Sequence, residues 1–302
     1  MDTDIGGDVD DLCALAMVLG WPDAEITGIT TVAEHSGRRP GYAKHALDLA
    51  GSPPVPIAAG VDVSSGRYTD PMLVPDEATY WGGAVRSLPG PISAALDLLR
   101  HSIDLGAVIV ALGPYSNLDE LERSYPGTLP RAQLVLMGGH AFPPPAGFPP
   151  WGAAEDFNIQ ADVAAAETVL REGNPVLVPL NLTVQTVVER SQLPRLQQGG
   201  PFGALLARQI EAQARAEQTQ EKWGRPYPAL PDDMLAFLHD PLGCAVALGW
   251  DGVRLETLPI AWERDQELLR MRVEQAGRPA TLTMSVDGQT FRSKWLETVA
   301  RL

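Results

Sequence analysis

The hydrophobic positions of this chain follow two alternating spacings. Short β-branched or apolar runs between turn residues predict strands at residues 25–32, 55–59, 107–112, 133–137 and 176–180. Between these runs, apolar residues recur every three or four positions, which predicts helices at residues 12–19, 40–50, 92–102 and 162–172. Strands that alternate with helices are typical of parallel sheets. The pattern therefore predicts an α/β fold with an open, mainly parallel sheet flanked by helices.

The C-terminal half departs from this alternation of strands and helices. Residues 190–231 are rich in Gln, Ala and Arg, and predict a helical insertion within a single domain over residues 1–302. Residues 232–250 have a helical pattern interrupted at His239 and Pro241, so we expect a bend there, with Asp240 capping a helix that ends at Leu248. Strands near 253–260, 268–273 and 281–286 and a helix at 291–302 complete the chain. The Pro- and Gly-rich segments 61–91 and 140–154 predict loops over a site.

The N-terminal segment MDTDIGGDVDD carries five aspartates. It is typical of a strand end, a glycine turn and a helix start. Asp4 would project from the strand, and the Gly6–Gly7 turn would bring Asp8, Asp10 and Asp11 back towards it. Converging carboxylates suit Ca²⁺ or Mg²⁺, although Asp10 or Asp11 singly would be an ordinary helix cap. Most of this strand should precede the first residue, so we expect a truncated first strand.

Composition narrows the class of partner. The 302-residue chain has a formal net charge of −15, which disfavours nucleic acid and anionic membrane surfaces. Its two cysteines, Cys13 and Cys244, lie in apolar helical contexts and are expected to be buried free thiols. No apolar run is long enough to span a membrane, and the acidic N-terminus lacks the features of a signal peptide. We therefore expect a cytoplasmic protein.

Polar residues gather where the predicted strands end. Ligands of parallel α/β sheets bind beyond the carboxyl ends of the strands. The residues expected at or near this edge are Asp4, Leu112, Asn158, Asn181 and Asp240. A ligand site at this edge is therefore predicted.

Several motifs then resemble one family in the right order along essentially the whole chain. These are DTDIGGDVDDLCAL, ALGPYSNL, LVLMGG, EDFN and HDPLGCAVA. The first resembles the N-terminal signature of the nucleoside hydrolases, the inosine-uridine preferring family of Ca²⁺-dependent N-ribohydrolases, in a variant whose turn is two residues longer. The resemblance implies the open α/β fold of that family, a bound Ca²⁺, and a homo-oligomer, either a dimer or a tetramer.

The resemblance also implies a role for each matching residue. Asp4 would bind the metal and act as the base that activates the attacking water. The other metal ligands would be Asp11, the backbone carbonyl of Leu112, and Asp240. The ribose would be held by Asp10, Asn158 and either Asp156 or Glu155. His239 would help to protonate the departing base, although a structural hydrogen bond is an equal alternative for a histidine at a helix start.

Physical chemistry favours the same roles. Cleavage of an N-glycosidic bond builds positive charge on the ribose, and carboxylates around the sugar stabilise that charge. A divalent cation lowers the pKa of its water, so that Asp4 can take the proton.

Some positions depart from the family pattern. Glu34–His35 stands where an asparagine is common, and His35 becomes a candidate substrate contact. The first long loop has residues 79–82 in place of a His-Gly motif, and the loop after Gly139 lacks its usual asparagine. Four aromatic residues are candidates for stacking on a base or for core and lid packing: Trp81, Trp151, Trp223 and Tyr227. Asp8, which the longer turn adds, either joins the metal or faces solvent.

The predicted function is Ca²⁺-dependent hydrolysis of a ribonucleoside or related N-riboside to ribose and free base. One alternative is a non-catalytic, metal-dependent nucleoside or sugar binder, because the altered loops surround the sugar and base. A Mg²⁺ aspartyl phosphatase is a weaker alternative, suggested by the DxD at the first strand end. The remaining carboxylates of the turn would repel a phosphate.

Overall fold

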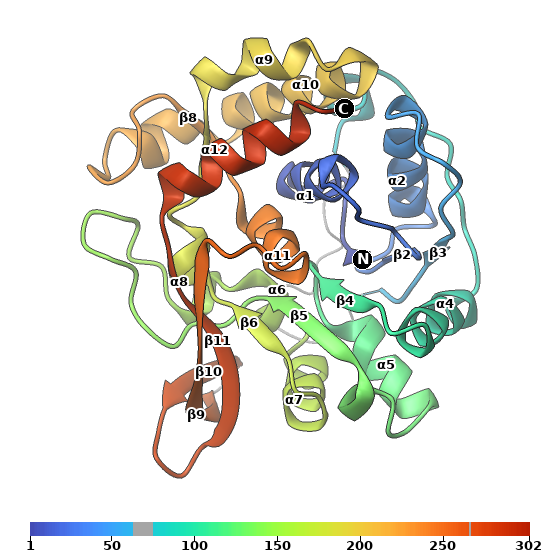
Figure 1. Ribbon diagram of the computed structural model, residues 1–302, viewed down its shortest axis with the longest axis vertical. Helices are drawn as coiled ribbons and strands as arrows, with labels where there is room; N and C mark the ends of the chain where they lie inside the picture. The colour runs from blue at the N-terminus through green and yellow to red at the C-terminus, as the bar shows by residue number, and fades with distance from the viewer. Residues whose placement is uncertain (63–74, 266) are drawn as a thin grey trace.

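A computed structural model describes residues 1–62, 75–265 and 267–302 of the chain. Its centre is a nine-stranded sheet with the order β10-β9-β11-β6-β5-β4-β1-β2-β3 (Figure 1). The strands from β3 to β6 run parallel, β11 continues parallel to β6, and β9 and β10 extend the sheet antiparallel. Their bounds are β1 Asp2–Thr3, β2 Ile29–Thr31, β3 Ile57–Ala59, β4 Val108–Ala111, β5 Gln133–Met137, β6 Val176–Val178, β9 Val253–Asp265, β10 Leu268–Val273 and β11 Arg278–Val286. The predicted open, mainly parallel sheet is confirmed.

Helices cover both faces of this sheet (Figure 1). On one side, a common core holds side chains of the sheet and of α1 (Asp10–Gly20), α2 (Arg38–Leu49), α10 (Gly200–Ala216), α11 (His239–Ala247) and α12 (Gly288–Val299). The other packs against α4 (Ile92–Asp104), α5 (Ser116–Ser124) and α7 (Val163–Glu172). Residues of β4 alternate between the faces, since Val110 belongs to the first core and Ile109 to the second. A strand buried on both faces explains why its sequence is continuously apolar.

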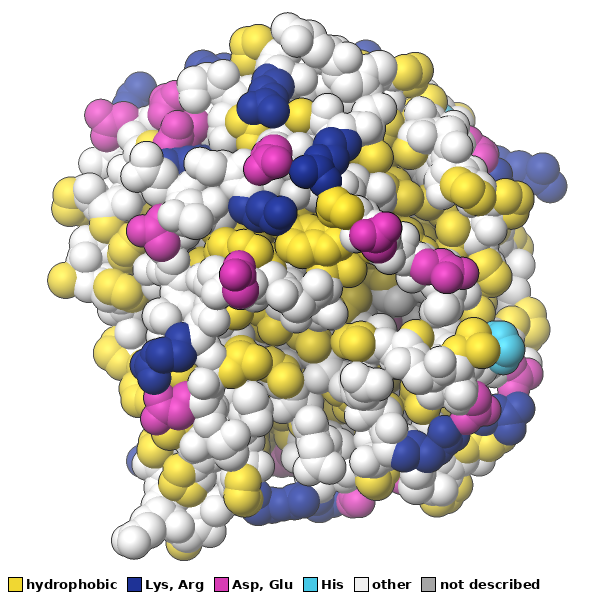
Figure 2. All heavy atoms as spheres, viewed as in Figure 1, with side chains coloured by type: hydrophobic (Ala, Val, Ile, Leu, Met, Phe, Trp, Pro, Cys, Tyr) yellow, Lys and Arg dark blue, Asp and Glu magenta, His cyan; other side chains and the backbone are white. Residues whose placement is uncertain are grey.

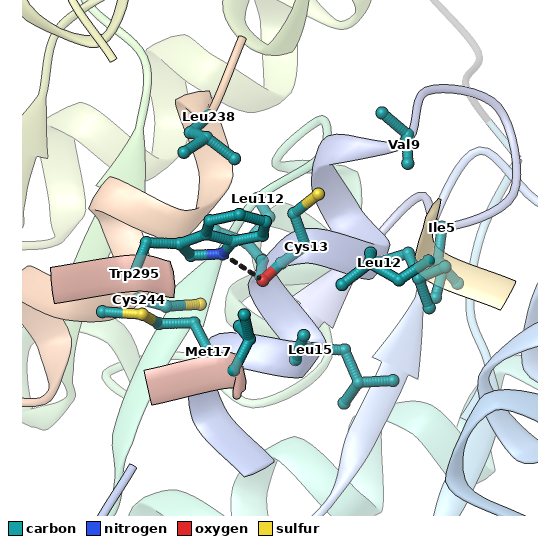
Figure 3. Packing of buried hydrophobic residues seen from close by; sticks show 14 of the residues in the cluster. Ile5, Val9, Leu12, Cys13, Leu15, Met17, Leu112, Leu238, Cys244 and Trp295 are labelled. Carbon is teal, nitrogen blue, oxygen red and sulfur yellow. Dashed lines mark hydrogen bonds between the residues drawn. The ribbon is translucent and has the colours of Figure 1, made fainter. Parts of the chain in front are cut away.

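In the first core, buried side chains of α1, α11 and α12 meet, Cys13, Cys244 and Trp295 among them (Figure 3). The indole nitrogen of Trp295 donates a hydrogen bond of 3.1 Å to the carbonyl of Cys13, so α12 is tied to α1. Cys13 and Cys244 are both buried free thiols, as predicted. This packing matters for function because α1 and α11 both begin at the strand edge where the acidic residues lie.

Most predicted elements are present. Strands β2, β3, β4 and β6 are shorter than predicted, β5 and β10 match the predicted ranges, and β9 and β11 are longer. The helical prediction for residues 232–238 is wrong, because Met234–Phe237 form strand β8, which pairs antiparallel with β7 (Val187–Glu189). The prediction failed because this short apolar run is buried under α10, and a fully buried run has no hydrophobic periodicity that distinguishes a strand from a helix. Asp240 does not cap α11 either. Its N-cap is Leu238, and Asp240 lies in the first turn.

The predicted helical insertion contains α9 (Leu193–Gln197), α10 and a π-helical turn, η4 (Gln220–Gly224). Of the long loop predicted at 61–91, residues 63–74 lie outside the described residues. The remainder includes the short helix α3 (Glu77–Tyr80).

Charged side chains of both signs are mixed on the face of the molecule in view in Figure 2. Figure 2 shows Lys and Arg side chains scattered among Asp and Glu on the face in view, without a continuous basic patch. No helix in the described ranges is both long and apolar enough to cross a membrane.

Candidate active site

A cavity of about 520 Å³ lies at the carboxyl edge of the parallel strands. Asp4 follows β1, Leu112 follows β4 and Met137 ends β5, and all three line the cavity. A larger groove of about 740 Å³ lies at the opposite end of β6, between α7 and β9–β11. Glu167 is the only acidic side chain along the described part of that groove. The smaller cavity is therefore the one that holds the chemistry.

Three buried carboxylates meet in this cavity. Oxygens of Asp10, Asp11 and Asp240 lie within 4.8 Å of one another, because α1 and α11 start side by side. Burial, together with the neighbouring carboxylates, raises the pKa of all three well above the usual range of an aspartate. Neither Asp10 nor Asp11 caps α1 through its side chain, since the N-cap is Val9. Buried like charges without a capping role indicate a cation site.

The donors around this triad fit a hard divalent cation. Asp4 lines the same cavity, and burial raises its pKa to about 6. The hydroxyl of Thr3 donates a hydrogen bond to one oxygen of Asp11 and so orients that carboxylate. The carbonyl of Leu112 accepts a 2.6 Å hydrogen bond from the amide of Asn158, which leaves its second lone pair for a metal. The residues that could hold the cation are thus Asp4, Asp10, Asp11, Asp240 and the Leu112 carbonyl.

A buried arginine supports the acidic turn. The guanidinium of Arg39 donates to the carbonyls of Asp4 and Ile5, and its Nε donates to the carbonyl of Ala33 at 2.7 Å. Its positive charge also lowers the pKa of Asp4 and Asp11, against the effect of burial. Arg39 therefore stabilises the turn both as a hydrogen-bond donor and as a counter-charge.

The residues expected to bind ribose also line the cavity. Asp156 caps the short helix α6 (Phe157–Ala161) and accepts a 2.6 Å hydrogen bond from the backbone N–H of Gly139. Burial raises the pKa of Asp156 to about 6. Glu155 is exposed and accepts a 2.7 Å hydrogen bond from the N–H of Gly152, and Asn158 is buried against Leu112. Each is held by the protein and still borders the cavity.

The environment of His239 is compatible with both roles considered for it, a group beside the substrate and a structural hydrogen-bond partner. It borders the cavity, and its Nδ1 lies 2.7 Å from the hydroxyl of Thr183. Its ring packs against Phe237, at 5.1 Å between centroids, and against Trp151, at 5.8 Å. Burial lowers the pKa of His239 to about 4, against the opposing effect of the Asp8 carboxylate. The imidazole is therefore neutral at pH 7.

The structure separates the candidate aromatic residues. Trp151 and Trp223 line the cavity and contact each other edge to face, with centroids 4.9 Å apart. Tyr227 stacks behind Trp223 at 6.0 Å and is not among the lining residues. Trp81 is buried in the core, stacked on Tyr42 at 4.4 Å, so packing accounts for it. Of the candidates, only Trp151 and Trp223 can meet a ligand in the cavity as described.

Two further positions qualify the predicted site. His35 follows β2 but does not line the cavity, and its backbone N–H donates to the carboxylate of Glu34. Lys222, which the sequence gave no reason to select, does line it, with its ammonium group 4.8 Å from the Trp223 ring centroid. A lone lysine in a polar, helical segment gives no indication in the sequence that it lines a ligand cavity. Carboxylates still dominate the wall, which opposes a phosphate ligand.

Known proteins share this architecture. The profile of the family described as inosine-uridine preferring nucleoside hydrolase matches residues 1–299. The pyrimidine-specific ribonucleoside hydrolase RihA of Klebsiella pneumoniae subsp. pneumoniae is 29% identical over 263 residues, which cover 82% of this chain and 81% of that protein. The uncharacterized protein C1683.06c of Schizosaccharomyces pombe is 31% identical over 209 residues, just under two thirds of either chain at 65%.

Solved structures agree on the fold. The plant nucleoside hydrolase PpNRh1 superposes with a TM-score of 0.78 at 19% identity, covering 99% of this chain and 98% of that one. A purine-preferring ribonucleoside hydrolase from Gardnerella vaginalis has a TM-score of 0.76 at 22% identity, covering 99% and 97%. With the family profile over nearly the whole length and the acidic cavity at the strand edge, the chain belongs to the inosine-uridine preferring nucleoside hydrolases, which are glycosyl hydrolases.

Proposed function

We propose that this chain is a Ca²⁺-dependent hydrolase that splits a ribonucleoside, or a related N-riboside, into ribose and free base. The observation that carries the proposal is the convergence of Asp10, Asp11 and Asp240, within 4.8 Å, in the cavity that Asp4 also lines. Carboxylate and carbonyl oxygens are the donors that Ca²⁺ prefers.

Each residue then has a chemical task. Asp4, Asp11, Asp240 and the Leu112 carbonyl would hold the divalent cation, whose positive charge would make a nearby water more acidic. Asp4 takes the proton from the attacking water. Asp10, Asn158 and Asp156 or Glu155 bind the ribose hydroxyls, and the carboxylates stabilise the positive charge that develops on the sugar.

The departing base lies against the aromatic wall. Trp151 and Trp223 offer apolar ring surfaces for it, and His239 is within the same cavity as the candidate proton donor. Burial lowers the pKa of His239 to about 4, so donation requires substrate to raise it. This low pKa favours a second candidate function, a metal-dependent nucleoside binder without turnover.

One assay distinguishes the two. Ribose release is measured from a panel of purine and pyrimidine ribonucleosides, with Ca²⁺ and then with chelator. Chelator-sensitive release supports the hydrolase and identifies the preferred base. Binding of nucleosides without ribose release would support the binder, and neither result would refute both.

We also propose a homo-oligomer, a dimer or tetramer, by similarity to the family. Light scattering on the intact protein measures this directly, and a monomer at all concentrations would contradict it.

A further inference from the structure

One edge of the sheet ends in a strand without a strand neighbour on its outer side. β10 is the last strand in the order, pairs only with β9 among the described residues, and lies in the part of the sheet at the lower left of Figure 1. The free edge of a strand presents backbone N–H and C=O groups that need hydrogen-bond partners. At Leu269 these partners come from a helix beside the cavity.

Gln160 of α6 takes the place of a neighbouring strand at Leu269. Its Nε2 donates a 2.9 Å hydrogen bond to the carbonyl of Leu269, and its Oε1 accepts a 3.0 Å hydrogen bond from the N–H of the same residue, 109 positions away. Gln160 is only 1% exposed and Leu269 is buried as well, so water cannot readily replace these hydrogen bonds when they are lost. Both ends of one amide therefore fix α6 to β10.

The same short helix carries two of the residues proposed to bind the ribose. Asp156 caps α6, and Asn158 lies in its first turn. Both line the cavity, whereas Gln160 does not. Because α6 has only five residues, a displacement of Gln160 would displace these two side chains with it.

β10 also supports the hydrogen-bond partner of Asp156. The backbone N–H of Gly139 donates to Asp156 at 2.6 Å. A methyl group placed on Gly139 would lie 3.4 Å from the sulfur of Met271, so β10 packs directly on this glycine. β10 further contacts the 3-10 turn η2 (Ala153–Glu155), which ends at the other candidate ribose ligand. The edge strand therefore braces the sugar end of the cavity through each of these contacts.

We propose that Gln160 is a positioning residue for sugar binding: by joining α6 to the open edge of β10, it holds Asp156 and Asn158 where they meet the ribose. The inference rests on the proposed function, because it takes the ribose as the ligand of these two residues. It also gives the antiparallel end of the sheet a role in substrate binding, although no described residue of β9 or β10 lines the cavity.

Ribose binding separates this role from a purely structural one. Gln160→Met keeps the length of the side chain but loses both hydrogen bonds to Leu269. In the presence of Ca²⁺, we expect it to raise the dissociation constant of ribose, measured by isothermal calorimetry, and the KM for nucleosides, each by about 10-fold. The dissociation constants of free bases stay unchanged. Loss of stability alone would lower the amount of active protein, and hence the apparent kcat, but not KM.

Two further variants complete the comparison. Gln160→Asn keeps the amide but is one methylene shorter, so it cannot reach both groups of Leu269. We expect a smaller rise in the ribose constant, of about threefold, and this variant decides the question if Gln160→Met does not fold. Gln192→Met is the matched control. Gln192 is buried outside the cavity wall and accepts a 2.8 Å hydrogen bond from the N–H of Glu189, so its loss destabilises the protein without changing ribose binding.

A double variant tests whether Gln160 acts through α6. Asn158→Ala removes one of the proposed sugar contacts directly. If Gln160 positions Asn158, Gln160→Met raises the ribose constant by a smaller factor in the Asn158→Ala background than in the wild type, because the contact that it aligns is already lost.

Three results would overturn the inference: unchanged ribose binding in both Gln160 variants, an equal loss of affinity for free bases, or fully additive effects in the double variant. An equal loss of ribose affinity in Gln192→Met would also overturn it, since destabilisation would then explain the effect. If the wild type binds ribose but releases none from any nucleoside, the proposed hydrolase fails, and the ribose constants still decide the role of Gln160. A wild type that binds no ribose refutes the inference directly.

Discussion

At the scale of single residues, the site is dominated by the cost of burying carboxylates. Asp10, Asp11 and Asp240 are each at least nine-tenths buried, and their charges face one another. Burial of unpaired like charges is tolerated when a cation or a proton neutralises them. The same cost explains why the guanidinium of Arg39 is buried under the turn.

Removal of one triad carboxylate is expected to weaken metal binding. We predict that Asp11→Ala and Asp240→Ala each lower Ca²⁺ affinity by on the order of 100-fold, because each removes a charged ligand from a site with few protein donors. Isothermal calorimetry measures this, with the exposed Asp97→Ala as a control of the same chemistry. Unchanged affinity in both triad variants would contradict the metal site.

Replacement of the proposed base separates catalysis from folding. We predict that Asp4→Asn lowers kcat on the order of 100-fold or more, because an amide cannot take a proton from water. With chelator present, the thermal midpoint should not fall, since the substitution removes a buried carboxylate whose pKa burial raises to about 6. Turnover near that of the wild type would remove Asp4 as the base.

The raised pKa of Asp156 makes the unfolding free energy depend on pH. Its pKa is about 6 in the folded protein and near 3.8 unfolded, so the folded state binds the proton more tightly. Its contribution therefore favours folding at low pH and is lost as pH rises from about 4 to 6, by about 3 kcal/mol. We predict that the unfolding free energy of Asp156→Asn decreases less than that of the wild type over this pH range. Urea titrations in the presence of chelator measure it. Parallel curves for the two proteins would contradict the shift.

At the scale of elements, two helix starts build the proposed metal site. The triad draws Asp10 and Asp11 from α1 and Asp240 from α11, and neither helix has a side-chain N-cap. Their relative position depends on the core that they share with α12, where Trp295 is fully buried. Packing remote from the cavity therefore sets the distances among the ligands.

Disruption of that core should destabilise the protein. We predict that Trp295→Leu lowers the unfolding free energy by about 3 kcal/mol, because it leaves a cavity and removes the hydrogen bond to the Cys13 carbonyl. Urea unfolding measures the change. Trp21→Leu serves as the control. Trp21 is partly exposed under Lys294, so its replacement should lower the unfolding free energy much less.

At the scale of the whole molecule, metal binding and stability are linked. The chain has a formal net charge of −15, and part of that charge is concentrated at one edge of the sheet. Charge repulsion among those carboxylates opposes the compact state, and a cation that binds only the folded state relieves it.

Calcium is therefore expected to raise the thermal midpoint. We predict stabilisation of about 2.7 kcal/mol when free Ca²⁺ is 100 times its dissociation constant, reversed by chelator. Scanning calorimetry measures it, and Asp240→Ala should lose most of the effect. An equal response to Ca²⁺ in that variant would place the stabilising ion elsewhere.

The sequence alone determined the fold class and the composition of the acidic edge. The strand and helix patterns can be identified from short stretches of sequence. Residues that directly follow parallel strands lie at the same edge of the sheet, whatever the order of the strands. Asp4 and Leu112 could therefore be placed together, and the structure brings them into one cavity with Asp11 and Asp240. Their chemical roles stay predictions.

Only the tertiary structure decided which candidates line the cavity. It buries Trp81 against Tyr42, leaves His35 outside the cavity, and brings Lys222 into the cavity wall. It also joins Gln213 to Asp8 across 205 residues. Such contacts depend on how distant helices pack on the sheet, and side chains that meet only through packing leave no periodic signal along the chain. Local pattern therefore predicts which residues lie at the edge of the sheet, while packing decides which of them line the cavity.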